Sequence, residues 1–229
     1  MRINKYISET GFCSRRETDR LISARRITIN NVICLPGASV APEDVVLIDG
    51  NAIASKGEAV YIALNKPVGI TCTAAKHVTG NIIDFINHPY RIFAIGRLDK
   101  ASEGLILLTN DGDIVNKMMR SENGHEKEYL VKVDKPVTSQ FLQEMSNGVN
   151  ILDTRTKPCA AIMHSEYEFR IILTEGLNLQ IRRMCKALGF RVLRLERIRI
   201  MNITLDGLEK GEWKDLTAGQ LQGLLAQLN

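Results

Sequence analysis

Apolar residues recur with helical spacing twice near the start of the chain, over residues 3–10 and again over 14–23. The pattern then changes to alternating apolar and polar residues, at 27–30 and later at 45–50, which is typical of short strands. This order predicts a compact module of two helices and a few strands over residues 1–54. The stretch NAIASKGEA, which overlaps the end of this module, is expected to be a linker.

The rest of the chain mixes strand and helix patterns without regular alternation. Strands are expected at YIALNKP, GLILLTN, KEYLVKVD, EFRIILT and RVLRLERIRIMNITL. The apolar phase of the last segment slips near Glu196, which indicates a β-bulge. Helices are expected after Asn178 and after a capping box of Thr217 and Gln220. Because a doubly wound parallel sheet needs regular alternation, we expect an α+β fold.

The composition is that of an ordinary globular protein, with 45% hydrophobic and 24% charged residues among 229. No apolar run approaches the roughly 18 residues that a membrane-spanning helix needs. The N-terminal residues lack the apolar core and cleavage site of a signal peptide. We therefore expect a cytoplasmic protein with no membrane partner.

Cysteine and histidine spacing gives no metal site. The five cysteines are an odd number and form no CxxC pair, so we expect buried or half-buried free thiols. The four histidines show neither HxxxH spacing nor cysteine neighbours. With no metal expected, any chemistry must come from side chains alone.

Positive charge is concentrated at the N-terminus. Residues 1–35 hold seven cations and three acids, which is 7 minus 3 and equals the whole net charge of +4. Such a patch on an otherwise neutral chain favours a polyanionic partner, although most charged helix faces are simply solvated. Ser14 and Glu17 form a capping-box pattern at the start of the second helix, where backbone N–H groups favour phosphate. The seven cations are Arg2, Lys5, Arg15, Arg16, Arg20, Arg25 and Arg26.

The most specific motif is AIGRLDKASEGLILLTNDGD at 94–113. An Arg-Leu-Asp triplet alone is a weak signal, because Asp99 could be a turn residue paired with Arg97 or Lys100. Further motifs follow in order: LNKPVG, HEKEYLV, EGLNLQIRRM and GEWKDLT. Together they resemble the RsuA branch of RNA pseudouridine synthases over essentially the whole chain. The helix, SRRE, ITIN and IDG features of the first module resemble the S4 RNA-binding domain.

This resemblance implies a small S4-type α/β RNA-binding module over 1–54, followed over 61–229 by a catalytic domain with a mixed, mainly antiparallel sheet. It implies isomerisation of uridine to pseudouridine without a cofactor, since nothing is oxidised. The segments HEKEYLVKVDKPVT and RIRIMNITLDG look most like a subgroup that acts on large-subunit (23S) ribosomal RNA. Transfer RNA is a further possible substrate, and we expect a monomer.

The same resemblance assigns the catalytic roles. Asp99 is the nucleophile or base, Arg182 is expected beside it to keep it ionised, and Tyr129 lies against the target base. Without the resemblance, Arg182 could be an exposed helix residue and Tyr129 a core residue. Four residues are expected to support the site: Lys66, Pro67, Arg97 and Ile181.

Three positions depart from the family pattern. Arg25 and Asn31 stand where glycine is frequent, and Leu179 stands where arginine is common. Alternative functions are an RNA-binding protein that has lost activity, a nucleoside hydrolase, or a synthase acting on small-subunit RNA or a tRNA loop. The sequence leaves open which uridine is modified, and whether Asp99 attacks the sugar or the base.

Overall fold

The computed structural model describes residues 1–75, 77–119 and 124–228. The chain divides into two compact units. The first holds residues 1–60 with the short segments 88–92 and 110–112, and the second holds the remainder. The domain boundaries expected from the sequence, 1–54 and 61–229, stay predictions.

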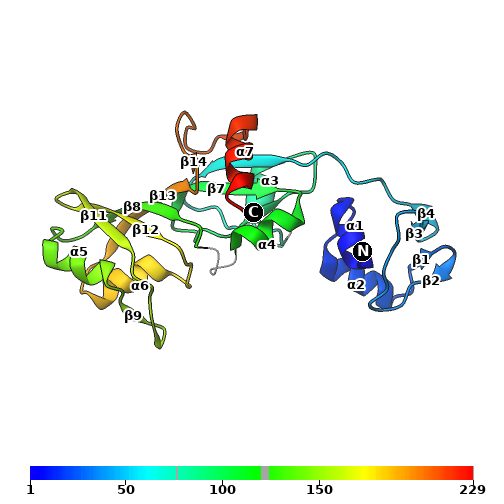
Figure 1. The fold of residues 1–229 in the computed structure, drawn as a ribbon, viewed down its shortest axis with the longest axis horizontal. Coiled ribbons are helices and arrows are strands. Elements are labelled where there is room, and N and C mark those ends of the chain that lie inside the picture. Colours follow the sequence, from blue (N-terminus) through cyan, green and yellow to red (C-terminus); the bar gives the residue numbers. More distant parts are fainter. Residues whose placement is uncertain (76, 120–123, 229) are drawn as a thin grey trace. The chain divides into compact units, whose positions relative to one another are not determined.

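The first unit has two helices and a small antiparallel sheet, in the predicted order (Figure 1). The helices are α1 (Ile3–Glu9) and α2 (Arg15–Ser23). The sheet has the order β2-β1-β3-β4, with β1 at Ile27–Ile29, β2 at Val32–Ile33, β3 at Val46–Ile48 and β4 at Asn51–Ala52. Its core is formed by apolar residues from both helices and the sheet, among them Ile7, Leu21 and Ile27.

At the start of α2, only one of the two hydrogen bonds of the predicted capping box is present. The Ser14 hydroxyl accepts a hydrogen bond from the Glu17 backbone N–H at 3.1 Å. The Glu17 carboxylate, however, pairs with the guanidinium of Arg20 at 2.9 Å. Beyond α2, Arg25 and Asn31 have φ of 55° and 65°, the left-handed region that explains why glycine is common at these positions.

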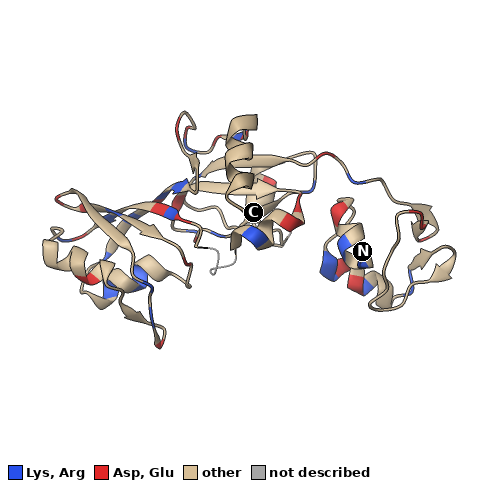
Figure 2. Ribbon diagram, in the orientation of Figure 1, with Lys and Arg blue, Asp and Glu red and all other residues tan. Residues whose placement is uncertain are grey.

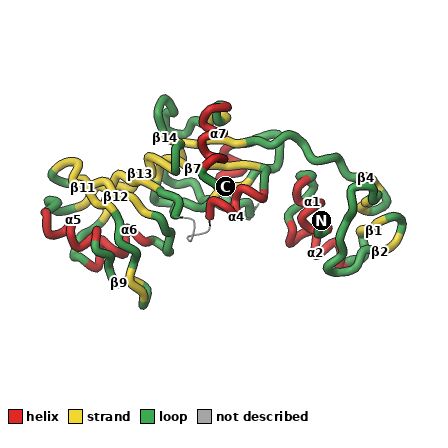
Figure 3. Tube along the Cα trace, in the orientation of Figure 1, coloured by secondary structure: helices red, strands yellow, loops and turns green. Residues whose placement is uncertain are grey.

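The second unit is built on a nine-stranded sheet with the order β11-β12-β8-β13-β7-β5-β15, to which β14 and β6 add by pairing with β13 and β7 (Figures 1 and 3). The strands are β5 (Tyr61–Lys66), β6 (Phe93–Ile95), β7 (Glu103–Thr109), β8 (Lys127–Val133), β11 (Ala160–Ser165), β12 (Glu168–Leu173), β13 (Val192–Ile200), β14 (Ile203–Thr204) and β15 (Trp213–Asp215). Only β13 and β7 pair in parallel among these described strands. The expected α+β fold with a mixed, mainly antiparallel sheet is therefore confirmed.

Five helices and a small hairpin complete this unit. They are α3 (Ile82–Ile86), α4 (Gly112–Met119), α5 (Ser139–Ser146), α6 (Gln180–Ala187), α7 (Ala218–Ala226) and the hairpin β9 (Asn150–Ile151) to β10 (Thr154–Arg155). Helices α5 and α6 share one apolar core with β8, β12 and β13. Helices α4 and α7 share a second core with β5 and β7. The capping box predicted for Thr217 and Gln220 is present at the start of α7.

The prediction of one long strand over 191–205 is wrong in one respect. It is two antiparallel strands, β13 and β14, joined by a tight turn in which Met201 has φ of 51°. The pairing of β13 with β8 shifts register on both sides of Glu196. This agrees with the bulge expected near that residue.

All five cysteines are free thiols, as predicted. Cys34, Cys72 and Cys185 are buried, whereas Cys13 and Cys159 are half-buried. Burial raises the pKa of Cys185 to about 12 and that of Cys159 to about 11.

The described residues include neither a membrane-spanning helix nor a cluster of metal ligands. Within 1–75, 77–119 and 124–228, no helix is long and apolar enough to cross a membrane. In the same ranges, no group of three or more His, Cys, Asp or Glu residues could hold a metal ion.

Candidate functional site

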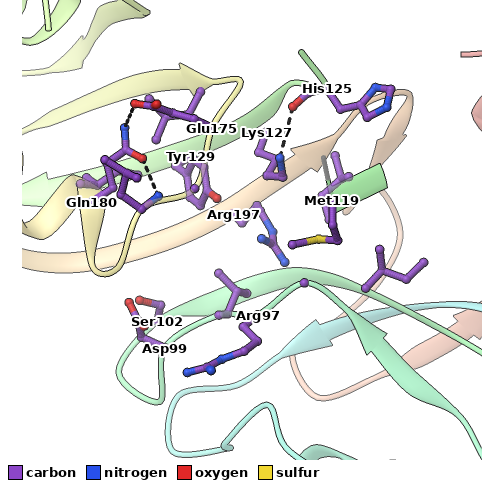
Figure 4. Close-up of a pocket in the computed structure, with 18 of the residues that line it drawn as sticks. Arg97, Asp99, Ser102, Met119, His125, Lys127, Tyr129, Glu175, Gln180 and Arg197 are labelled. Atoms are coloured by element: carbon purple, nitrogen blue, oxygen red, sulfur yellow. Dashed lines mark hydrogen bonds between the residues drawn. The ribbon is translucent and has the colours of Figure 1, made fainter. Parts of the chain in front are cut away.

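The second unit contains a pocket with a volume of about 800 Å³ (Figure 4). Its walls come from the loop between β6 and β7, from β8 and β13, and from the segment that leads into α6. Four of the predicted site residues line it: Arg97, Asp99, Tyr129 and Ile181. The pocket therefore brings together residues that lie far apart in the sequence.

Asp99 stands in the loop that joins β6 to β7, and backbone contacts fix this loop on both sides. The Leu98 side chain is buried, and the Leu98 backbone N–H donates to the Cys72 sulfur at 3.4 Å. The Asp99 carbonyl accepts from the Ser102 N–H at 3.0 Å, and the Lys100 carbonyl accepts from the Gly69 N–H at 2.8 Å. These contacts fix the backbone position of Asp99, which is half-buried and lines the pocket.

The Arg182 side chain forms hydrogen bonds with this loop and not with the Asp99 carboxylate. Its Nη2 donates to the Ala101 carbonyl at 3.0 Å and to the Ser102 hydroxyl at 3.2 Å. No ion pair joins Arg182 to Asp99 among the described residues. The direct pairing expected from the sequence is replaced by these contacts because the loop turns its backbone carbonyl, a strong acceptor, toward the guanidinium.

Lys66 and Pro67 do not line the pocket, and they stabilise the turn at 66–70 that is hydrogen-bonded to the Asp99 loop. The Lys66 side chain is fully buried, and its ammonium donates to the carbonyls of Pro67 at 2.9 Å and Ile70 at 3.0 Å. Burial lowers the pKa of Lys66, and the negative charge of Asp99 is among the influences that oppose this shift. The braced turn connects to the Asp99 loop through the Gly69 hydrogen bond.

Tyr129 reaches the pocket from β8, where it pairs across the sheet with Arg197 of β13. The guanidinium carbon of Arg197 lies 6.0 Å from the centre of the Tyr129 ring, within the range of a cation–π contact. Arg197 is 3% exposed, and its Nε donates to the Leu105 carbonyl at 2.7 Å. The sequence reasoning missed Arg197, because β13 carries three arginines and nothing in the local pattern marks this one as buried.

The segment that leads into α6 is held by Gln180, which is 5% exposed. Its amide nitrogen donates to the Glu175 carboxylate at 2.7 Å, and its amide oxygen accepts from the Leu177 N–H at 2.9 Å. Leu179, at the start of the helix, has φ of 52° and lines the pocket. The residue that departs from the family pattern therefore places an apolar side chain at the pocket wall.

A second cation, Lys127, lines the pocket near Arg197. Its ammonium donates to the His125 carbonyl at 3.3 Å. Burial lowers the pKa of Lys127, and the positive charge of Arg197 lowers it further. This part of the pocket therefore carries concentrated positive charge.

Lys and Arg positions gather on the two helices of the first unit (Figure 2). The seven cations predicted to bind RNA differ in how far their side chains are engaged within this unit. Arg20, Arg26 and Lys5 form ion pairs with acidic residues of the same unit, namely Glu17, Asp49 and Glu9. Arg2 donates to the Gly37 carbonyl at 2.7 Å. Arg15, Arg16 and Arg25 are exposed and form no ion pair within the described part of the chain. These three are therefore the cations most available to an external phosphate.

Comparison with known proteins gives the class. The family described as RNA pseudouridylate synthase matches residues 60–187, and the S4 domain matches residues 1–46. The chain belongs to the RNA pseudouridine synthase family, and it is an isomerase that acts on RNA.

Three relatives place it within that class. The dual-specificity RNA pseudouridine synthase RluF of Escherichia coli (strain K12) is 53% identical over 96% of this chain and 77% of its own length. The ribosomal small subunit pseudouridine synthase A of Yersinia pestis is 33% identical over 96% of this chain and 97% of its own. A crystal structure of a pseudouridylate synthase superposes with a TM-score of 0.73 at 29% identity, covering 98% of this chain and 99% of the other.

Proposed function

We propose that this isomerase converts a uridine of 23S ribosomal RNA to pseudouridine and that transfer RNA is a second substrate. The 53% identity to a dual-specificity synthase, against 33% to a small-subunit synthase, supports this choice. The segments HEKEYLVKVDKPVT and RIRIMNITLDG, which resemble the large-subunit subgroup, support it further. The proposal includes a monomeric enzyme that works in the cytoplasm.

Asp99 is the catalytic carboxylate in this proposal. The reaction breaks the bond from the ribose C1′ to the uracil N1, turns the base and rejoins it through C5. An ionised carboxylate can start that cleavage as a nucleophile or as a base. The observation that carries the proposal is that Asp99 and Tyr129 line one pocket from opposite walls, so that a base stacked on the Tyr129 ring would face the carboxylate (Figure 4).

Arg182 acts in this proposal as a positioning residue. It binds the backbone of the loop two and three residues beyond Asp99, so it fixes where the carboxylate projects. Lys66 and Pro67 brace the turn that bonds to the same loop. Arg97 and Ile181 contribute to the pocket wall.

The test of the catalytic assignment is Asp99→Asn. The variant should fold within about 1 kcal/mol of the wild type, because it is nearly isosteric and no ion pair of Asp99 is present in the described structure to be broken. The modified uridine is first mapped by comparing pseudouridines in ribosomal RNA from wild-type and deletion strains. Turnover on a 23S fragment that contains this uridine should then vanish, while RNA affinity should persist. Asp153→Asn, in the exposed β9–β10 turn, is the matched control. A folded Asp99→Asn enzyme that still forms pseudouridine would overturn the assignment.

RNA binding by the first unit is tested through salt dependence. Replacing Arg15, Arg16 and Arg25 by Gln should make the negative slope of log affinity against log salt shallower by roughly two to three units, because each lost phosphate contact removes just under one. Replacing Arg20 and Arg26 should lower it less, because their charges are already paired. An unchanged slope in the triple variant would show that the patch is only a solvated surface.

A further inference from the structure

Arg197 is a buried cation with an unused hydrogen-bond donor in the candidate active site. Its Nε is satisfied by the Leu105 carbonyl, but its Nη2 is buried and has no partner among the described residues. An unpaired buried charged group is costly, and a catalytic role is one of the reasons for which a protein keeps such a group. Figure 4 shows Arg197 extending from β13 beside Tyr129, with Asp99 on the other side of the pocket.

The reaction generates negative charge on the base. When the C1′–N1 bond breaks, its electron pair stays on uracil and the charge spreads over the oxygens O2 and O4. C5 then bonds to C1′, C5 loses its proton and N1 gains one, so no electrons are exchanged overall. Attack of a carboxylate on the base would also place negative charge on a carbonyl oxygen. A buried guanidinium would stabilise the charged base in either route.

The surroundings of Arg197 fit a base better than a phosphate. The side chain is 3% exposed, and its guanidinium carbon lies 6.0 Å from the Tyr129 ring centre. A base that enters beside the Tyr129 ring would bring one edge toward this guanidinium. The pocket wall next to it includes the apolar residues Leu195 and Ile200. A phosphate is normally bound at a solvent-accessible place by several hydrogen-bond donors. Exposed arginines meet these requirements better than Arg197 does.

We propose that Arg197 is a further catalytic residue, which binds a carbonyl oxygen of the extruded uracil through Nη2 and offsets the charge on the base while it is detached from the ribose. The inference rests on the proposed assignment of this pocket as the uridine site. Lys127, on the same wall, adds to the positive potential there.

The first test is Arg197→Met, which keeps the aliphatic length and removes the guanidinium. The single-turnover rate of pseudouridine formation should fall by about 100-fold or more, as for the loss of one donor to a developing anion. RNA affinity and its salt slope should not change. Arg199→Met is the matched control: this arginine is on the same strand, pairs with Glu126 and Glu128 and does not line the pocket. Its rate should stay near wild type.

Two results would overturn the inference. One is a folded Arg197→Met enzyme with a rate near wild type. The other is weaker RNA binding with a salt slope lower by about one unit and an unchanged single-turnover rate, which would make Arg197 a phosphate contact. If Asp99→Asn is inactive in either case, the proposed function stands and only the role of Arg197 fails.

A second measurement uses the wild-type enzyme, so it does not depend on whether the variant folds. The target uridine is replaced by 2-thiouridine or by 4-thiouridine in otherwise identical RNA. Sulfur stabilises a negative charge on the base and should by itself speed cleavage, but it is a weak hydrogen-bond acceptor. The substrate whose sulfur replaces the oxygen that Arg197 contacts should lose this hydrogen bond. Its rate of pseudouridine formation should therefore fall by about tenfold relative to uridine, despite the better leaving group. Two thio-substrates that both react as fast as uridine would contradict the proposal.

Discussion

Gly104 lies where β7 and β13 run in parallel, directly opposite Arg197. Its φ is 99°, and a Cβ atom there would collide with the Arg197 carbonyl oxygen and lie 2.7 Å from the Arg197 nitrogen. Ordinary van der Waals contact begins near 3.4 Å, so Gly104→Ala requires the strands to part by about 0.7 Å or more. Because both atoms belong to backbone, no side-chain rotation can relieve the collision.

The expected loss of stability has two parts. The left-handed φ costs an alanine about 1–2 kcal/mol. Moving β13 away weakens the hydrogen bond from Arg197 to the Leu105 carbonyl, which has a charged donor and contributes about 1.5–3 kcal/mol. Gly104→Ala should therefore destabilise the protein by about 2.5–5 kcal/mol. Gly69→Ala is the matched control, because Gly69 has φ of 95° with nothing within 4 Å of its added Cβ, and it should show the first part alone.

The assay is urea unfolding followed by tryptophan fluorescence. Trp213 is the only tryptophan of the chain and pairs with Leu64 in the sheet, so its signal reports on the second unit. The displaced Arg197 should also lower the rate of pseudouridine formation in Gly104→Ala. Equal destabilisation by Gly104→Ala and Gly69→Ala would refute the argument from backbone collision.

The remaining predictions concern two other charged groups. Burial opposes the ionisation of Glu103, but hydrogen bonds from Lys210 and Arg194 outweigh it and lower its pKa from 4.5. The ionised Glu103 therefore stabilises the fold above pH 4.5, and this stabilisation is lost as the pH falls through the lower pKa of the folded state. Glu103→Gln should cost about 1–3 kcal/mol of unfolding free energy at pH 7. The cost should become progressively smaller below pH 4.5, as measured by urea unfolding at each pH. Arg182→Lys keeps the charge but cannot form the same two-acceptor contact, so turnover should fall at least tenfold with RNA affinity unchanged, and a larger effect on Kd than on turnover would contradict its positioning role.

Strong apolar runs made most of the central strands predictable. The segments for β5, β7, β8 and β12 match the observed strands within one residue or two at each end. Strand β11 was missed because it is largely exposed, so it lacks the apolar alternation on which the prediction depends. The turn between β13 and β14 was missed because Met201 and Asn202 have neither glycine nor proline to mark it.

The site was predictable only as far as its motifs extend. The motifs led to four residues that line the pocket: Arg97 and Asp99 from 94–113, Tyr129 from HEKEYLV and Ile181 from EGLNLQIRRM. The contacts of Arg182 and Arg197 were not predictable, because their acceptors are backbone carbonyls 81 and 92 residues away in the chain. Such contacts arise from the strand order of the sheet, which local spacing does not encode.

The burial of the thiols has a consequence for chemical labelling. A thiol whose pKa is about 12, as for Cys185, is ionised to only about one part in 100,000 at neutral pH, and the thiolate is the form that reacts with alkylating reagents. Cys159 is suppressed in the same way, and Cys34 and Cys72 are shielded by burial. Cys13, half-buried in the N-terminal unit, is then the natural attachment point for a fluorophore, so the native sequence can report on that unit without engineered cysteines.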